Sequence, residues 1–257
     1  MKITILGSGA AYGVPMIFNT WGNAEKTNPK NNRTRASILL EIKGKNILID
    51  AGPDFREQIN KNNIKNIDSV FITHGHYDHI GGVPELPRAT KLLGHSINVY
   101  AASETMTELK NSYGYLFKAV TAAEPDSKSL NWKLLPNEGK FTAEGLEFKT
   151  FQLPHHFMHS SAFRYQNVAY VTDWQQMPET VKDQLRNLDL LILECNNGTE
   201  PADNGHSDLF KVKEVLAEIN PRQTVLTHLS IRVDYETLSQ KLPENCILAY
   251  DGMHIEI

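Results

Sequence analysis

Short apolar runs separated by turn-forming residues dominate the pattern of this chain. Runs of this length are typical of buried or half-buried strands. The predicted strands cover residues 3–6, 38–42, 47–50, 70–73, 97–100, 146–153, 168–172, 190–194, 224–227 and 247–250. Between two of them, Lys43-Gly44-Lys45-Asn46 predicts a hairpin, because glycine readily adopts the positive φ of a tight turn.

Helical periodicity is confined to fewer segments. Residues 53–62 and 178–187 each begin with proline and then an acidic residue, which favours a helix start. Ser207 is a candidate N-cap before apolar residues at helical spacing over 209–219, and residues 234–241 form a shorter candidate. Residues 118–140 lack a regular pattern and predict a surface loop or an insertion.

Strands in blocks with interspersed helices predict two packed sheets flanked by helices, an α+β class. The chain has 257 residues, enough for one substantial core, and no linker is visible. We therefore predict one domain over residues 1–257. The expected architecture is an αββα sandwich.

Charge and composition exclude several functions. The 26 Lys and Arg residues against 30 Asp and Glu residues give a net charge of -4, which argues against stable nucleic-acid binding by bulk electrostatics. The apolar runs are too short to cross a bilayer, and no signal peptide is visible. Cys195 and Cys246 make no disulfide framework and suit a reducing compartment. We predict a cytoplasmic protein without membrane association.

The strongest chemical feature is a histidine-rich segment directly after the predicted strand at 70–73. It reads Thr73-His74-Gly75-His76-Tyr77-Asp78-His79. Imidazole and carboxylate groups at the end of a strand suit Zn, Mn or Fe, and alternation along an extended backbone would place His74, His76 and Asp78 on one side. We therefore predict a metal site here.

The pattern H-x-H-x-D-H after an apolar strand resembles the signature of the metallo-β-lactamase superfamily. That resemblance implies an αββα sandwich with one or two metals at one edge of the sheets. It also implies a further His, an Asp and a last His after later strands. Leu153-Pro154-His155-His156, Thr172-Asp173 and Thr227-His228 supply them.

By this resemblance, two divalent cations, Zn²⁺ or Mn²⁺, share a set of seven ligands. One cation is held by His74, His76 and His155, the other by Asp78, His79 and His228, and Asp173 bridges them. The sequence leaves open whether His155 or His156 is the ligand, and His155 is favoured because it directly follows Leu153-Pro154.

Further motifs along nearly the whole chain are similar to the PhnP-type phosphodiesterases. They are Gly7-Ser8-Gly9, Gly13-Val14-Pro15, Asn32-Arg33-Thr34-Arg35-Ala36-Ser37, Asp50-Ala51-Gly52-Pro53-Asp54-Phe55-Arg56, Gly205-His206-Ser207-Asp208-Leu209 and Leu226-Thr227-His228-Leu229-Ser230. The resemblance implies hydrolysis of a small cyclic phosphodiester, such as a ribose cyclic phosphate or a 2′,3′-cyclic nucleotide. From the resemblance alone we also expect a homodimer.

The same resemblance places His206 at the family's active-site histidine. We expect it to protonate the leaving alkoxide, with Asp78 sharing in proton handling besides binding metal. Arg33 and Arg35 are candidate contacts to the substrate phosphate. A solvated basic turn explains these two arginines equally well, so both readings stay open.

One departure from the PhnP pattern concerns a separate structural zinc. The family's cysteine cluster is missing from the segment after Gly13-Val14-Pro15, and Ile231 stands where the family has a histidine. We therefore expect no structural zinc. Apolar packing by Phe18, Trp21 or Ile231 is a candidate replacement.

Two alternative functions stay open. The first is hydrolysis of a lactone, thioester or other carbonyl substrate, because the fold alone does not fix the substrate. The second is a metal-binding accessory protein of the PqqB type without hydrolytic turnover, which predicts missing ligands or a blocked metal position.

Overall fold

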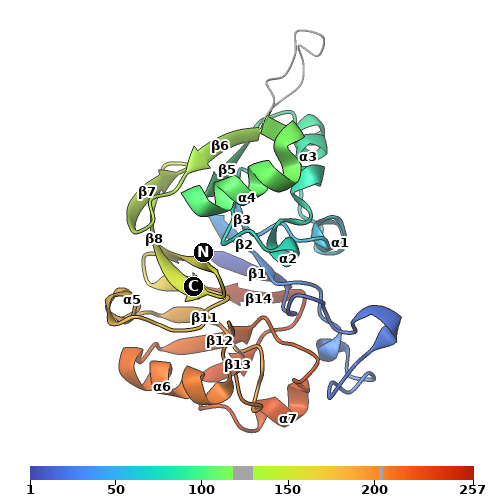
Figure 1. Ribbon diagram of the computed structural model, residues 1–257, viewed down its shortest axis with the longest axis vertical. Helices are drawn as coiled ribbons and strands as arrows, with labels where there is room; N and C mark the ends of the chain where they lie inside the picture. Colours follow the sequence, from blue (N-terminus) through green and yellow to red (C-terminus); the bar gives the residue numbers. More distant parts are fainter. Residues whose placement is uncertain (118–129, 203–204) are drawn as a thin grey trace.

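The computed structural model describes residues 1–117, 130–202 and 205–257, and two mixed sheets of seven strands each form its centre (Figure 1). The first sheet runs in the order β14 (Met253–Glu256), β1 (Lys2–Gly7), β2 (Ser37–Ile42), β3 (Lys45–Ile49), β4 (Ser69–Phe71), β5 (Ile97–Ala101), β6 (Leu130–Leu134). The second runs β13 (Cys246–Leu248), β12 (Gln223–Thr227), β11 (Leu190–Glu194), β10 (Val168–Val171), β9 (Met158–Tyr165), β8 (Leu146–His155), β7 (Gly139–Ala143).

Helices cover the outer face of each sheet. The α-helices are α1 (Phe55–Lys61), α2 (Tyr77–Ile80), α3 (Leu86–Leu93), α4 (Ser103–Tyr113), α5 (Glu179–Gln184), α6 (Leu209–Ile219) and α7 (Tyr235–Ser239). Short 3-10 turns are η1 (Ile17–Asn19), η2 (Pro29–Asn31), η3 (Val83–Glu85) and η4 (Gly114–Phe117). Phe55 and Leu109 join a buried cluster on the first sheet, and Val181, Val212 and Leu238 join one on the second.

A third apolar cluster fills the space between the two sheets. Phe71 of β4 is central to it, with ring centroids 5.1 Å from Phe148 and 5.2 Å from Phe163, which belong to the opposite sheet. Every residue of β11 is buried, as expected for a central parallel strand with both faces covered. Three apolar layers between four structural layers confirm the predicted αββα sandwich.

Most predicted elements are present, with informative differences. Residues 118–129 of the predicted loop lie outside the described residues, whereas 130–134 form β6, so that part of the prediction is wrong. Helix α6 is capped by Asp208, which accepts a hydrogen bond from Lys211 N, and not by Ser207. Phe18 is 94% exposed, so it does not replace a structural zinc by apolar packing.

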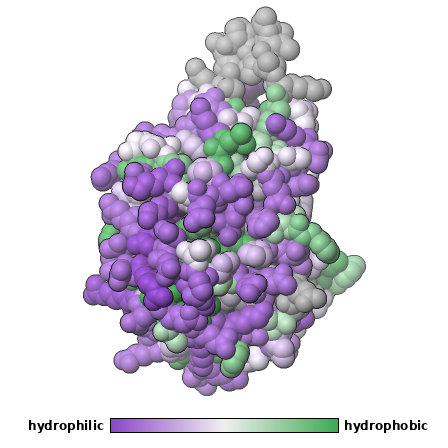
Figure 2. All heavy atoms as spheres, turned by 60° about the vertical axis from the view of Figure 1, so that its left-hand side comes forward, coloured by the Kyte–Doolittle hydropathy of each residue, from purple (hydrophilic) through white to green (hydrophobic). Residues whose placement is uncertain are grey.

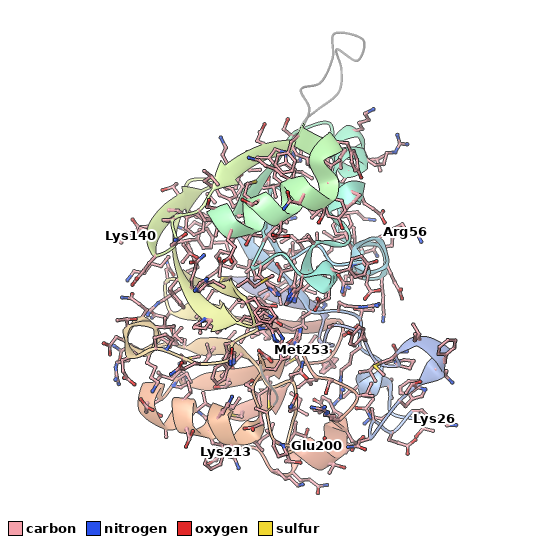
Figure 3. All side chains as sticks on the ribbon, viewed as in Figure 1. Lys26, Arg56, Lys140, Glu200, Lys213 and Met253 are labelled. Carbon is pink, nitrogen blue, oxygen red and sulfur yellow. The ribbon has the colours of Figure 1, made fainter. Side chains whose placement is uncertain are left out.

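The surface is charged and the core is apolar. The labelled side chains of Lys26, Lys140 and Lys213 project from the edge of the molecule in Figure 3. Figure 2 shows a face covered mainly by hydrophilic residues. Within the described ranges, every helix is too short or too polar to traverse a bilayer.

The strand directions determine where functional loops meet. Strands β3 and β4 are parallel, and so are β10, β11 and β12. The loops that follow these strands therefore leave each sheet at one edge. The candidate site lies there.

Candidate metal centre

The histidine-rich segment after β4 is a turn leading into a helix, not an extended strand. Strand β4 ends at Phe71, and α2 begins at Tyr77 with His76 as its N-cap. The expected alternation of His74, His76 and Asp78 along an extended backbone is therefore wrong. Their side chains still face one site, because the turn places Asp78, in the first turn of α2, beside His79 and His228, while His74 lies beside His76, His79 and Asp173.

Three imidazole nitrogens face one another on one side of the site. His76 Nδ1 lies 3.0 Å from His74 Nε2 and 3.1 Å from His155 Nε2. His155 donates from Nδ1 to the carbonyl oxygen of Gly205 at 2.7 Å, so its Nε2 presents a lone pair to this cluster. The three nitrogens form a donor set for one cation.

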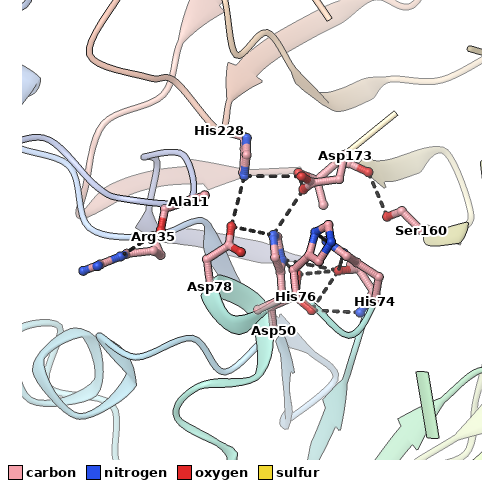
Figure 4. A network of polar contacts seen from close by, with 12 residues as sticks. Ala11, Arg35, Asp50, His74, His76, Asp78, Ser160, Asp173 and His228 are labelled. Atoms are coloured by element: carbon pink, nitrogen blue, oxygen red, sulfur yellow. Dashed lines mark hydrogen bonds and ion pairs between the residues drawn. The ribbon is translucent and has the colours of Figure 1, made fainter. Parts of the chain in front are cut away.

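A second donor set lies beside the first (Figure 4). Asp78 Oδ2 lies 3.0 Å from His79 Nε2 and 3.5 Å from His228 Nε2. The three residues are buried, and His228 follows strand β12 of the opposite sheet. The second set therefore draws on loops of both sheets.

Asp173 lies between the two sets. Its Oδ2 is 3.2 Å from His79 Nε2, and its Oδ1 is 3.6 Å from His155 Nε2 and 3.5 Å from His228 Nε2. Thr172 Oγ1 donates to Oδ2 at 2.7 Å and helps to orient the carboxylate. This is the position that a bridging ligand requires.

Backbone strain accompanies these donors. Asp50, Asp173 and His228 each follow a strand and have φ values of 65°, 54° and 55°. Left-handed backbone is uncommon in residues other than glycine and clusters at functional sites. Here it turns the chain sharply at the edge of each sheet, beside the clustered side chains.

Electrostatics at His74, His76, His155 and Asp173 favour the protonation states that bind cations. Burial lowers the pKa of His74 well below its usual range and that of His76 to about 4. Burial also lowers the pKa of His155. For Asp173 burial acts to raise the pKa, but His228 and His79 outweigh it and hold that pKa well below its usual value. Neutral imidazoles and ionised carboxylates are the forms that bind metals.

His79 shows how strongly the surrounding carboxylates favour positive charge in the site. Burial acts to lower its pKa, yet Asp78, Asp173 and Asp50 raise that pKa well above the usual value. Among the described residues, all ion-pair partners of Asp78 and Asp173 are histidines. The carboxylates therefore have no permanent cation of the protein beside them.

The donor set fits divalent metal ions. His79 Nε2 is buried and makes no hydrogen bond to any described residue, although carboxylate oxygens lie 3.0 Å and 3.2 Å away. A buried nitrogen without a hydrogen-bond partner is rare in proteins. A role as metal ligand explains it here, because other nitrogen and oxygen donors surround the atom. The structure brings together all seven predicted ligands.

His155 and His156 occupy different environments. His155 is fully buried and faces His76, whereas His156 is exposed, with its ring centroid 5.9 Å from that of His76. His156 still lies near His155 and His206. The geometry favours His155 as the ligand.

His206 lies at the edge of the cluster, held by a carboxylate that the sequence analysis missed. Its Nδ1 is 2.8 Å from Oε1 of the fully buried Glu194, whose Oε2 accepts from Trp174 N at 2.9 Å. The sequence signal for Glu194 is an acidic residue at the end of an otherwise apolar strand. Its partner is 12 positions away and is visible only in the fold.

Asp50 is a second missed residue of the same kind. This fully buried carboxylate lies 2.7 Å from His79 Nδ1 and accepts hydrogen bonds from Thr73 N and Oγ1. A histidine whose Nδ1 donates to a carboxylate presents Nε2 to a metal. Asp50 therefore orients His79.

The two candidate arginines, Arg33 and Arg35, occupy different environments. Arg33 is 1% exposed, and its guanidinium donates to Asn31 Oδ1 and to the carbonyl oxygens of Ser230 and Val233. The expected contact between Arg33 and substrate is therefore wrong, because the guanidinium is buried and donates its hydrogen bonds to other residues of the protein. Arg35 pairs with Asp54 at 3.1 Å, and its guanidinium points away from the carboxylates in Figure 4. Its role in binding substrate stays a prediction.

Comparison with known proteins decides the family. The model of the Beta-lactamase superfamily domain matches residues 45–229, which contain the seven clustered donors. The chain belongs to the metallo-β-lactamase superfamily. The fold of this superfamily implies divalent metal binding, in agreement with the clustered donors.

Relatives within the metallo-β-lactamase superfamily carry different names. An octanoyltransferase of Porphyromonas gingivalis is 26% identical over 98% of this chain, which spans about half (51%) of that protein. A ribonuclease Z of Archaeoglobus fulgidus is 27% identical over 94% of this chain and 98% of its own length. The crystal structure of a diphosphatase from the PhnP family matches with a TM-score of 0.89 at 28% identity, covering 100% of this chain and 97% of that one. The expected likeness to the PhnP type is confirmed.

Proposed function

We propose that this protein is a dinuclear metal-dependent hydrolase that cleaves a small phosphodiester. The observation that carries the proposal is the position of Asp173, whose two carboxylate oxygens face both donor sets. A carboxylate shared between two such sets is typical of sites with two cations. The names ribonuclease Z and diphosphatase among the relatives support phosphoryl chemistry.

The donor types support Zn²⁺ or Mn²⁺ as the cations. The clustered side chains offer imidazole nitrogen and carboxylate oxygen without a thiolate, a set that suits both ions. When bound, two such cations lower the pKa of water and neutralise the charge of a phosphodiester. The net charge of -4 supports a small diester over a long nucleic acid as substrate.

The protein's own residues supply orientation and a proton. Asp50 orients His79, and the Gly205 carbonyl orients His155. Glu194 accepts the Nδ1 proton of His206, which fixes the tautomer of the ring and makes Nε2 the nitrogen that can exchange a proton. We propose that His206 protonates the leaving alkoxide there, which a poor leaving group requires.

The first experiment is hydrolysis of bis(p-nitrophenyl) phosphate by protein dialysed against chelator and then supplied with Mn²⁺ or Zn²⁺. We expect turnover only with metal, about two cations per chain by elemental analysis, and a loss of at least about 100-fold in Asp173→Asn. Asp183→Asn is the matched control, because Asp183 is exposed and pairs with Arg186 on the surface. Absence of turnover in the metal-loaded protein, together with cleavage of a thioester or lactone, would replace this proposal by the carbonyl alternative.

A further inference from the structure

The tip of the β8–β9 hairpin is built from residues that a tight turn does not favour. Pairing continues to His155 opposite Met158, which leaves only His156 and Phe157 in the turn. His156 has φ 49°, a position where two-residue hairpins prefer glycine or asparagine. Turn chemistry therefore does not explain this pair of residues.

His156 packs its ring against the backbone beside the metal centre. A Cβ atom at Gly205 would come within 2.2 Å of His156 Cε1 and 2.3 Å of Nε2, so the ring lies directly against the Gly205 backbone and a side chain there would displace it. Ring centroids lie 4.5 Å from His155 and 5.5 Å from His206. The imidazole makes no hydrogen bond to a residue in the described ranges. The contact holds the hairpin tip beside His206.

Phe157 extends from this tip into solvent. Its side chain is 102% exposed, whereas Phe71, Phe148 and Phe163 are packed between the sheets. A fully exposed phenyl ring adds nothing to the core. In the turn two residues after His155, it offers a flat apolar face, and such faces stack on planar rings of ligands.

We propose that Phe157 is a binding platform for a planar ring of the substrate, a nucleobase or an aryl group, and that His156 positions it. This inference rests on the proposed function, because it assigns the class of diester that the same site takes. The diester phosphate lies at the metal centre, and the ring attached to its sugar or alcohol lies over Phe157. His156 acts through its contact with Gly205.

The test compares adenosine 2′,3′-cyclic phosphate with the 2′,3′-cyclic phosphate of methyl riboside, which lacks the base. For the metal-loaded protein we expect Phe157→Ala to raise KM for the adenosine compound about tenfold with little change in kcat. The compound without a base should be unaffected, and Phe157→Tyr should restore the wild-type KM. Phe18→Ala is the matched control, because Phe18 is 94% exposed on η1 and belongs to neither donor set.

A binding measurement without turnover distinguishes failure of this inference from failure of the proposed function. Calorimetry of the metal-loaded protein with adenosine 2′-monophosphate and with methyl riboside 2′-phosphate measures the contribution of the ring without turnover. A ring preference that Phe157→Ala and His156→Gly both reduce about tenfold supports the platform even if neither cyclic diester is cleaved. A preference that survives in Phe157→Ala, or that Tyr77→Ala removes instead, overturns the platform while leaving diester hydrolysis intact.

Discussion

The imidazole of His206 lies 2.8 Å from the buried carboxylate of Glu194, and this pairing fixes Nδ1 as the nitrogen that carries the proton of the neutral ring. Glu194 is held in turn by Trp174 N and by Ser207 N. A fixed carboxylate that accepts from Nδ1 sets the tautomer of the ring. His206 is therefore prepared for proton transfer through Nε2.

Glu194→Gln tests this relationship, because it keeps the shape and removes the charge. We expect kcat for a cyclic nucleotide to fall about 10- to 100-fold. His206→Ala should lower it by about 10² to 10⁴. Both losses should be smaller on bis(p-nitrophenyl) phosphate, since p-nitrophenolate leaves without protonation. Glu218→Gln on α6 is the control, and equal losses on both substrates would argue against an acid role.

Neighbouring histidines give a second, paired prediction. His155→Ala should remove at least one cation per chain, because the buried His155 Nε2 faces His76 Nδ1 at 3.1 Å. His156→Ala should keep the full metal content. Elemental analysis after gel filtration measures both, with circular dichroism to verify folding. A metal loss confined to His156→Ala would reverse the assignment.

Gly52 lies against the backbone of Asp78, in the segment that carries the metal ligands. A Cβ atom there would lie 2.1 Å from the Asp78 carbonyl oxygen, so Gly52→Ala must displace the Asp78 peptide. We expect a loss of roughly 1–3 kcal/mol in the free energy of unfolding and weaker metal binding. Gly114→Ala is the control, because its Cβ would meet nothing within 4 Å and its φ is -52°. That change should be neutral or stabilise by about 0.4–1 kcal/mol in urea unfolding.

Asp234 gives a prediction for pH. Burial raises the pKa of its carboxyl, but hydrogen bonds from Thr237, Asn31 and Glu25 N outweigh burial and hold that pKa at about 2. The unfolded value is about 3.9, so the carboxylate stabilises the fold fully above about pH 4 and progressively less toward pH 2. Asp234→Ala should cost roughly 1 kcal/mol at pH 7, because Asp234 caps α7.

The measurement is urea unfolding of the wild type and Asp234→Ala at pH 7, 5 and 3. The difference between the two proteins should persist from pH 7 to pH 5 and shrink at pH 3. Glu236→Ala, an exposed change on the same helix, controls for helix propensity. A difference that grows as the pH falls would contradict the assigned sign.

Strand-like runs carried most of the fold prediction. The predicted run 224–227 corresponds to β12, and 146–153 to most of β8, because continuous or alternating apolar residues leave few other solutions. Helices α3 and α4 were missed. Helix α3 spans only the eight residues Leu86–Leu93, and α4 buries only Thr105, Met106 and Leu109, so neither presents a long apolar repeat in the sequence.

The metal donors were predictable and their supporting residues were not. The histidine motif is recognisable in the sequence because several residues of metal-binding type lie within a few positions. Asp50 and Glu194 act through partners 29 and 12 positions away, and a single carboxylate after an apolar strand carries no distinctive pattern. Arg33 was misassigned for the complementary reason. Only packing shows that a charged side chain is buried among carbonyl oxygens.

The metal donors come from loops of both sheets, so the donor set is complete only once the two sheets have packed together. His79 and His228 present stacked rings 5.7 Å apart, although one follows β4 and the other follows β12 of the opposite sheet. The apolar core between the sheets brings these loops together at the entropic expense of closing a long chain segment. We therefore expect the core to place these loops before a cation binds. Small zinc domains fold only when the ion binds. In this protein the apolar core between the sheets, and not the ion, is expected to bring the ligands together.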